Sequence, residues 1–486
     1  MTKPAITSIL AILLLSPAAL RASRDAGDGW IPLFDGTTLD GWKAGENATT
    51  FTARDGAIVA NGPRSHLFYV GPVNNAEFAH FELKVDVMTR PGSNGGIYFH
   101  TRYQQAGWPR RGFEVQVNNS YKPDPIKTAS LYGLANITTA PAKDNAWFTQ
   151  HITVIGRYVT IRIDGRKVAE WAEPDPQSPT GRKRKRLSAG TFALQGHDPG
   201  STVLYKNIRV RPLRPLDFPI VDYHVHLKGG LTLDDAVALS ERLGIKFGIA
   251  VNCGLGFPVT SDQKAREFFK SLEGRPVFRA MQAEGREWLS MFSKDLIEQF
   301  DYVFTDAMTF TDNQGRRTRL WINNEVHIDD PQDFMEMYVE KIVGILENEP
   351  IDIYVNATFL PRAVAADYDK LWTPQRMDRV IHAARKNNIA IEINTRYRIP
   401  SIPFIRRAKA AGVKFSFGTN NGGRSDLGIP DYCLTAASIC QLTKQDMFTP
   451  KPKPASRPPD RPANAEKKTD NSGVLASHQQ VTPREN

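Results

Sequence analysis

The sequence predicts two folded domains in series: an all-β jelly-roll sandwich over residues 30–212, followed by an α/β barrel over 216–445. Three observations lead to this prediction. The 486 residues are more than one domain usually holds. The first region alternates apolar and polar residues with a period of two. The second alternates whole apolar strands with helical patterns.

The period-two pattern is clear in three segments of the first region, 81–87, 113–117 and 159–163. The last is followed by Asp164-Gly165, a dipeptide typical of hairpin turns. About ten such segments, with no helical pattern of four turns among them, indicate antiparallel strands packed as two sheets.

The second region contains seven repeats of a strand followed by a helix. Its strands are almost wholly apolar, as expected for a parallel sheet covered on both faces. Seven units in about 230 residues predict a closed (β/α)7 barrel rather than an open sheet. The strands begin near residues 220, 247, 277, 302, 351, 389 and 414, and the helices cover 233–243, 262–272, 294–300, 331–347, 374–386, 402–411 and 431–442.

The two ends of the chain have a different composition. Residues 1–22 hold one lysine, an apolar run at 9–15 and then small residues, the pattern of a signal peptide. We therefore expect a periplasmic or secreted protein; a buried N-terminal helix is the alternative. No other segment is long and apolar enough to span a membrane. The tail 449–486 is rich in proline and charge, which predicts disorder.

The formal charge of +10 raises the question of a nucleic-acid partner. The basic run 182–186 contributes five of these charges, and the tail from Lys444 contributes three, from eight basic and five acidic residues. The rest of the chain is nearly neutral, so we predict no nucleic-acid partner. The three cysteines are too few and too poorly spaced for a disulfide framework, and we interpret them as small apolar residues.

Each predicted barrel strand ends on polar residues, and the carboxyl ends of such strands form the active-site rim in barrels of this kind. His224 and His226 end the first strand and share one face of it. Glu284 ends the third and Asp306 the fourth. Two imidazoles with a carboxylate suit zinc, manganese or iron; structural histidines are the alternative. Further polar residues of the rim are Asn356, Asn420 and Arg396, which we expect to bind substrate.

The motif Asp222-x-His224-x-His226 resembles the opening of the polymerase and histidinol phosphatase superfamily, whose barrels hold up to three metals for phosphoester hydrolysis. The resemblance covers roughly residues 219–442. It implies a divalent metal on His224, His226 and Glu284. Asp306 stands where the family has a further histidine, and we count it as a fourth candidate ligand. Other positions depart from the family pattern: Asn356 stands where a histidine is usual, and the closing motif is Thr419-Asn420-Asn421. We expect one or two metals at most; a degenerate barrel that binds a ligand without metal is the alternative.

Glu114 and Gln116 lie two apart on one predicted strand of the sandwich, so both point to the same face. A carboxylate and an amide suit sugar hydroxyls, and a carboxylate also serves as acid or base. His197, in a late loop, is the expected catalytic partner of Glu114. Asn94, His100 and Trp108 join Gln116 as expected substrate-binding residues, with core packing as the alternative for the aromatic side chain.

A series of short motifs in the first region resembles the 3-keto-disaccharide hydrolase domain, also described as a 3-keto-glucoside lyase/hydratase. The motifs run from Trp30–Trp42 through 93–99 and 112–117 to Leu194-Gln195-Gly196-His197. The resemblance implies a concanavalin-A-like fold and cleavage of 3-keto glycosides by elimination. Either Glu114 or His197 could be the base. A sugar-binding sandwich without activity, attached to a metal-dependent phosphoesterase-like barrel, is the second hypothesis.

Overall fold

A computed structural model describes residues 29–177, 185–312 and 314–450. The expected signal peptide, and the expected tail apart from its first two residues, lie outside this range. No helix in the described ranges is long and apolar enough to cross a membrane.

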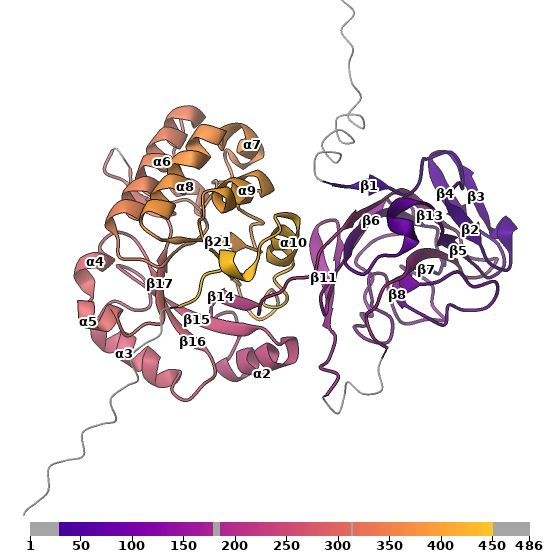
Figure 1. The fold of residues 1–486 in the computed structure, drawn as a ribbon, viewed down its shortest axis with the longest axis horizontal. Helices are drawn as coiled ribbons and strands as arrows, with labels where there is room; N and C mark the ends of the chain where they lie inside the picture. The colour runs from indigo at the N-terminus through magenta and orange to yellow at the C-terminus, as the bar shows by residue number, and fades with distance from the viewer. Residues whose placement is uncertain (1–28, 178–184, 313, 451–486) are drawn as a thin grey trace, which may run out of the picture. The chain divides into compact units, whose positions relative to one another are not determined.

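The first domain is a sandwich of two antiparallel sheets (Figure 1). The larger sheet has the order β11-β10-β9-β6-β13-β4-β3, with β1 paired to β13. Its strands are β1 (Ile31–Pro32), β3 (Phe51–Arg54), β4 (Ala57–Ala60), β6 (Phe81–Thr89), β9 (Phe148–Ile155), β10 (Tyr158–Ile163), β11 (Arg166–Ala172) and β13 (Val203–Pro212). The smaller sheet has the order β2-β5-β12-β7-β8, formed by β2 (Trp42–Ala44), β5 (Ser65–Tyr69), β12 (Thr191–Gly196), β7 (Gly95–Thr101) and β8 (Phe113–Val117).

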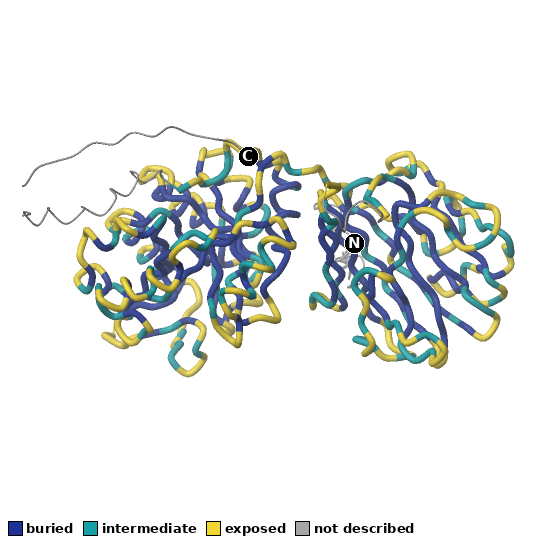
Figure 2. Tube along the Cα trace, turned by 90° about the horizontal axis from the view of Figure 1, so that it is seen from below, coloured by how far each residue is buried: buried dark blue, intermediate teal, exposed yellow. Residues whose placement is uncertain are grey.

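One apolar core holds the two sheets together. Val115 and Ile97 from the smaller sheet are fully buried, as are Ile152 and Val85 from the larger one. The alternation along β8 therefore places its apolar residues in the core and leaves Glu114 on the opposite face. Figure 2 shows buried segments running through the interior of the domain, with exposed residues gathered in the loops.

The second domain is a closed barrel of seven parallel strands, in the order β14-β15-β16-β17-β20-β21-β22. The strands are β14 (Val221–Val225), β15 (Lys246–Cys253), β16 (Phe278–Ala283), β17 (Tyr302–Thr305), β20 (Ile353–Tyr354), β21 (Ala390–Asn394) and β22 (Phe415–Gly418). Each lies within three residues of its predicted start. The longer helices are α2 (Leu233–Leu243), α3 (Asp262–Ser271), α6 (Pro331–Asn348), α8 (Pro374–Lys386), α9 (Ile402–Ala410) and α10 (Asp431–Ile439).

Local sequence signals fix the ends of these helices. Thr232 forms a capping box with Asp235 at the start of α2, and Gly244 ends that helix with a positive φ of 65°. Asp330 accepts the backbone N–H groups of Gln332 and Asp333 at the start of α6, and Pro331 occupies its first turn.

The strand–helix alternation is irregular in the middle of the barrel. The helix predicted at 294–300 is reduced to a single turn, α5 (Lys294–Ile297), and a separate turn, α4 (Trp288–Met291), precedes it. A small hairpin, β18 (Thr309–Thr311) with β19 (Arg317–Arg319), follows β17 and was not predicted. A further short helix, α7 (Tyr368–Leu371), precedes α8. These departures leave a closed parallel barrel whose connections are not uniform.

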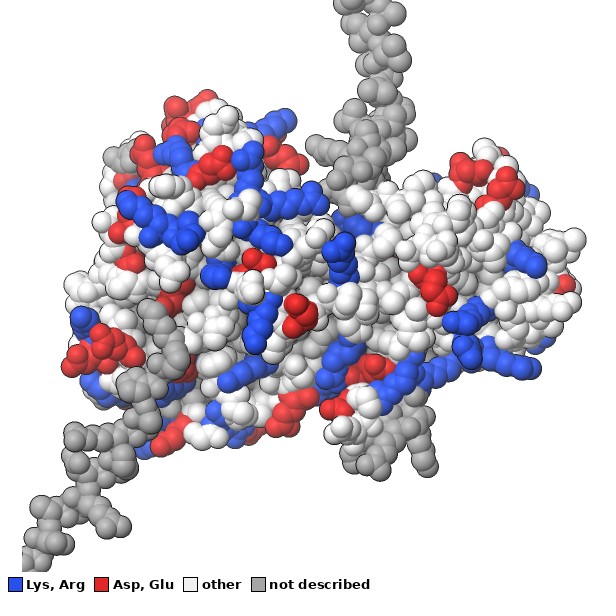
Figure 3. Space-filling model, in the orientation of Figure 1, with Lys and Arg blue, Asp and Glu red and all other residues white. Residues whose placement is uncertain are grey.

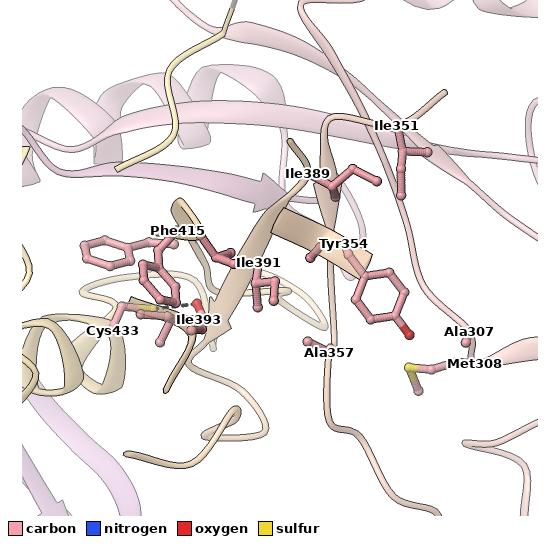
Figure 4. Packing of buried hydrophobic residues seen from close by; sticks show 14 of the residues in the cluster. Ala307, Met308, Ile351, Tyr354, Ala357, Ile389, Ile391, Ile393, Phe415 and Cys433 are labelled. Atoms are coloured by element: carbon pink, nitrogen blue, oxygen red, sulfur yellow. Dashed lines mark hydrogen bonds between the residues drawn. The ribbon is translucent and has the colours of Figure 1, made fainter. Parts of the chain in front are cut away.

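Charged residues of both signs are interspersed on the face drawn in Figure 3. The three cysteines are free and buried. Cys433 packs among apolar residues of β21 and β22, and its thiol donates to the carbonyl oxygen of Ile393 at 2.9 Å (Figure 4). The cysteines thus behave as small core residues.

Candidate functional sites

The sandwich has a cavity of about 440 Å³ beside its edge strand β8, with Glu114, Tyr98 and Tyr132 in its wall. Cross-strand register places Tyr98 directly opposite Glu114. Gly96 leaves room for the carboxylate, because a Cβ there would lie 2.6 Å from Glu114 Oε1. The Gly95-Gly96 motif is therefore part of how the site is built.

Glu114 is held by two neighbours. The Tyr98 hydroxyl donates to Oε2 at 2.7 Å, and the Gln195 amide donates to Oε1 at 3.1 Å. Burial raises the pKa of Glu114, and these two hydrogen bonds and the nearby His197 oppose the increase. A carboxyl with a raised pKa is suited to holding a proton and passing it on.

His197 follows directly after β12 and pairs with its neighbour Asp198. The distance from His197 Nδ1 to Asp198 Oδ2 is 2.6 Å. Asp198 is itself fixed by the Ser201 hydroxyl at 3.0 Å. A carboxylate that holds Nδ1 fixes the tautomer and leaves Nε2 available as a base.

The other predicted residues of the sandwich have mixed placements. Trp108 is 44% exposed and lies 5.5 Å from His197, ring centre to ring centre, so it borders the same region. Gln116 is buried, and its amide donates to Asp124 at 3.0 Å. Asn94 is buried too, and its backbone N–H donates to Ser201 at 2.9 Å.

His100 lies in the core and not on the wall of the cavity. Its ring packs edge-on against Phe81, Phe99 and Phe113, and its Nε2 lies 3.0 Å from the carbonyl oxygen of Ala79. Burial lowers its pKa to about 4. The ring is therefore placed as a structural residue, and the backbone of His100 has a positive φ of 55°.

The barrel has a larger cavity, of about 680 Å³, at the carboxyl ends of its strands. Most of the predicted barrel residues share its wall, so the strand ends do meet at one rim. Its lining includes His226, Glu284, Asp306, Asn356, Arg396 and Asn420. His224 is not part of that lining and is 1% exposed.

Hydrogen bonds within the protein occupy both nitrogens of His224. Nδ1 lies 2.6 Å from Glu392 Oε1, and Nε2 lies 3.3 Å from Gln282 Oε1. Burial raises the pKa of Glu392, but His224 reverses the effect and holds it below its usual value. The Gln282 amide in turn donates to Glu284 Oε1 at 2.9 Å. A neutral amide therefore bridges the first and third predicted ligands.

The second histidine is fixed by the closing motif. Asn421 accepts the backbone N–H of His226 at 2.7 Å and donates to its carbonyl oxygen at 2.9 Å. His226 Nδ1 lies 3.2 Å from the carbonyl oxygen of Ala250. Asp222 fixes the residue that follows β22, because its carboxylate accepts a hydrogen bond from the hydroxyl of Thr419 at 2.7 Å. These residues of the two motifs join the first strand to the last.

The two carboxylates in the cavity are also bonded within the protein. Glu284 accepts from Asn252 at 2.7 Å, and Asp306 accepts from Asn356 at 2.8 Å. Burial raises the pKa of Glu284, and the negative charge of Asp306 raises it further. Burial likewise raises the pKa of Asp306.

Asparagines form a network along the far side of the cavity. Asn356 Oδ1 accepts from Asn394 at 3.1 Å and from Asn420 at 3.2 Å. Asn356 and Asn420 have positive φ values of 52° and 47°. Such conformations are uncommon outside glycine and gather at functional sites.

The predicted metal set does not assemble. No group of three or more histidine, cysteine or acidic side chains in the described ranges is arranged to hold an ion. His224 forms hydrogen bonds with Glu392 and Gln282. The side-chain oxygen of Asn356 already accepts two hydrogen bonds from other asparagines. The sequence could not reveal this, because the spacing of a motif does not show what else its side chains bind.

The rim of the barrel cavity is cationic and aromatic. Arg396 donates to the carbonyl oxygen of Asn420 at 3.2 Å and to Asp426 at 3.3 Å. Lys228 and Arg362 also line the cavity, and neither forms an ion pair with a described residue. Trp321 is 42% exposed on the same wall.

Sequence reasoning missed several residues that hold the predicted ones in place. Tyr98 and Gln195 stand inside the quoted motifs, yet neither type alone signals a role. Asp198 was adjacent to His197 and could have been proposed as its partner. Lys185 belongs to the basic run, but it lines the sandwich cavity and donates to the carbonyl oxygen of Gly112 at 3.1 Å. Gln282 is the second-last residue of β16, and an amide at that position does not by itself signal a role.

Comparison with known proteins gives a family match over the first domain. Residues 29–211 match the family model of the 3-keto-alpha-glucoside-1,2-lyase-like domain, which confirms the resemblance found in the sequence. No curated protein matches the chain.

Several solved structures are similar to parts of the chain. A candidate glycosyl hydrolase from Parabacteroides distasonis is 20% identical, covers 39% of this chain and 97% of its own, and has a TM-score of 0.33. The carbohydrate-binding module CBM66 from Bacillus subtilis is 13% identical, with 36% and 98% covered and a TM-score of 0.27. Histidinol phosphate phosphatase from Lactococcus lactis, in complex with zinc, L-histidinol and phosphate, is 13% identical, with 47% and 95% covered and a TM-score of 0.34.

Proposed function

We propose that the sandwich, whose residues 29–211 match the 3-keto-alpha-glucoside-1,2-lyase-like domain, cleaves glycosides of 3-keto sugars by elimination. One observation carries the proposal. Gln195, two residues before His197 in the chain, donates to Glu114 at 3.1 Å, and Asp198 holds Nδ1 of His197 at 2.6 Å. An acid and a base thus stand in one region of the sandwich.

The reaction requires two proton transfers. The hydrogen at C2 of a 3-keto sugar is acidic because it is next to the C3 carbonyl. A base removes it, the electron pair forms the C1–C2 double bond, and the C1–O bond breaks. A proton delivered to the departing oxygen completes the cleavage, and water can add to the double bond later.

We assign the base to His197 and the acid to Glu114. Asp198 holds Nδ1 of His197, so Nε2 is free to take the C2 proton. Burial raises the pKa of Glu114, which favours the protonated form that can donate to the leaving oxygen. Trp108, 44% exposed beside His197, offers an aromatic face for the sugar.

The assay is release of methanol from methyl 3-keto-glucoside by the full chain, because an alkoxide leaving group needs the proton assigned to Glu114. Glu114→Gln and His197→Ala should each lower kcat at least about 10²-fold. Glu241→Gln, an exposed carboxylate-to-amide change on α2, is the matched control and should be silent. Deuterium at C2 should slow the reaction of the native protein. Full activity in Glu114→Gln would remove this assignment.

Asp198 is a positioning residue in this scheme. Asp198→Asn should lower kcat about 10²-fold with little change in KM, because the imidazole loses its tautomer and not its contact with substrate. Asp198→Glu should restore part of the activity. An equal loss in both variants, accompanied by a lower melting temperature, would indicate a structural role only.

The alternative is a sandwich that binds sugar without cleaving it. The exposed Trp108 and the amides near Glu114 would support this equally well. Binding of methyl 3-keto-glucoside by the native protein, with no methanol released, would favour that function.

Two broader expectations belong with this proposal. We place the activity in the periplasm or outside the cell, on the basis of the apolar run 9–15 and the small residues after it. We also class the barrel as (β/α)7, with the connection between β16 and β17 reduced to short turns. Determination of the mature N-terminus tests the first expectation.

A further inference from the structure

We propose that the cavity at the mouth of the barrel binds a sugar that carries a carboxylate, and does so without a metal ion. The inference does not depend on the activity proposed for the sandwich. It is argued from the floor of the cavity, its rim and its aromatic wall.

At the floor of the cavity, an amide side chain occupies the place where the Asp222-x-His224-x-His226 motif predicts a metal ion. Gln282 Oε1 lies 3.3 Å from His224 Nε2, and the Gln282 amide donates to Glu284 at 2.9 Å. An ion shared by His224 and Glu284 would have to displace this amide, and Glu392 already holds the other nitrogen of His224 at 2.6 Å. The floor is therefore satisfied by hydrogen bonds of its own.

This floor suits hydroxyl groups. Glu284 and Asp306 present carboxylate oxygens that accept from hydroxyls, and Asn252 and Asn420 present amides that both donate and accept. The network around Asn356 holds these groups in place, so little order has to be created on binding. A polyol with several hydroxyls at fixed angles matches such a surface.

The rim supplies positive charge that is available to a ligand. Lys228 and Arg362 form no ion pair with a described residue. Arg396 is held over the cavity by Asn420 and Asp426. Gly422 permits this, because a Cβ there would lie 2.7 Å from the Arg396 guanidinium. Guanidinium groups favour carboxylate and phosphate.

The carboxylates below the rim decide between these two anions. The negative charge of Asp306, which also raises the pKa of its neighbour Glu284, would repel a phosphate dianion more strongly than a carboxylate unless a cation stood between them. A carboxylate carries a single charge and can stay at the rim, while the hydroxyls of the same sugar reach the floor. Trp321, 42% exposed on the wall, offers a face for the sugar ring. The volume of about 680 Å³ is within the range of small-molecule sites.

Calorimetry on the full chain in EDTA tests the proposal, with D-glucuronate, D-glucose and glucose 6-phosphate as probes. Glucuronate should bind at least about tenfold more tightly than glucose, since charge-assisted hydrogen bonds add to the hydroxyl contacts. Equal binding of the two sugars, tighter binding of glucose 6-phosphate, binding that requires added Zn²⁺ or Mn²⁺, or no binding at all would overturn it.

Variants locate the site. Arg362→Ala and Arg396→Ala should each weaken glucuronate about tenfold and leave glucose little changed. Arg424→Ala is the control, because Arg424 pairs with Asp235 and does not line the cavity. Trp321→Ala should weaken both sugars. Arg362 is exposed, so its replacement should not unfold the protein. A loss of affinity in this variant therefore reports on glucuronate binding. An unchanged affinity in both arginine variants would contradict the assignment.

The proposed activity of the sandwich and the proposed binding site of the barrel can be tested independently. Glu114→Gln should abolish cleavage of 3-keto-glucoside and leave glucuronate binding intact. Loss of glucuronate binding in Glu114→Gln would place the acidic sugar in the sandwich and overturn the inference.

Discussion

Glu114 occupies a position where burial disfavours its negative charge. Tyr98 and Gln195 donate to the carboxylate and offset part of this cost, yet the pKa stays raised. A carboxyl whose pKa is higher in the folded state favours folding most below its unfolded pKa of 4.5, and this contribution is lost as the pH rises through the folded value.

Glu114→Gln should therefore become more stable relative to the native protein as the pH is raised. The two proteins should have similar melting temperatures near about pH 4, and the variant should melt higher at about pH 8. Thermal unfolding across this range measures the difference, with Glu241→Gln as the control. A difference that is constant with pH, or that favours the native protein at the higher pH, would contradict the role given to burial.

For single residues, the sequence predicted which side chains line the barrel cavity better than it predicted their hydrogen-bond partners. His226, Glu284 and Asp306 lie around one cavity, as the strand ends indicated. The partners of these groups could not be predicted, because Gln282 and Glu392 reach them from other strands. The placement of His100 was not predicted either: its ring packs against Phe99 in the core, and its positive φ of 55° cannot be read from the residue type.

Strand β22 depends on a glycine at its last position. A Cβ on Gly418 would overlap Glu392 Oε1 and lie 2.8 Å from His224 Cβ. The buried pair formed by those side chains requires the space. In α6, by contrast, a Cβ on Gly344 would meet no atom within 4 Å.

The two glycines should respond in opposite directions to alanine. Gly418→Ala should lower the free energy of unfolding by about 3 kcal/mol, because it overpacks the core and separates the His224–Glu392 pair. Gly344→Ala should raise it by about 0.5–1 kcal/mol, since alanine favours a helix interior. Denaturant titration of both variants gives the values. A neutral Gly418→Ala would show that the pair is not sensitive to local packing.

Elements with strong local signals were predicted well. α2 and α8 have the bounds that their caps and periodicity indicated. The helix predicted at 294–300 is shorter in the structure, because Ser293 caps a turn that ends at Ile297. The hairpin of β18 and β19 was not predicted. Its strands have three residues each, and period-two alternation can be recognised only over longer segments.

The positive charge of the whole molecule is concentrated in particular segments. There are 62 basic and 52 acidic residues, and five of the excess charges belong to the run 182–186. On the face drawn in Figure 3, both basic and acidic side chains are distributed over the surface. Affinity for a polyanion would therefore come from this short run and not from a groove.

This distribution predicts a weak and salt-limited interaction with DNA. A run of five charges can release few counterions, so the slope of log K against log salt should be no steeper than about −4.5. Gel-shift titration should detect binding only at low salt, and none at about 0.15 M salt. Replacing Arg182, Lys183 and Arg184 with glutamine should remove most of the low-salt binding, while Arg266→Gln with Arg275→Gln, elsewhere on the surface, should not. Retention of DNA at the higher salt, or binding unaffected by loss of the run, would mean that a basic surface exists beyond it.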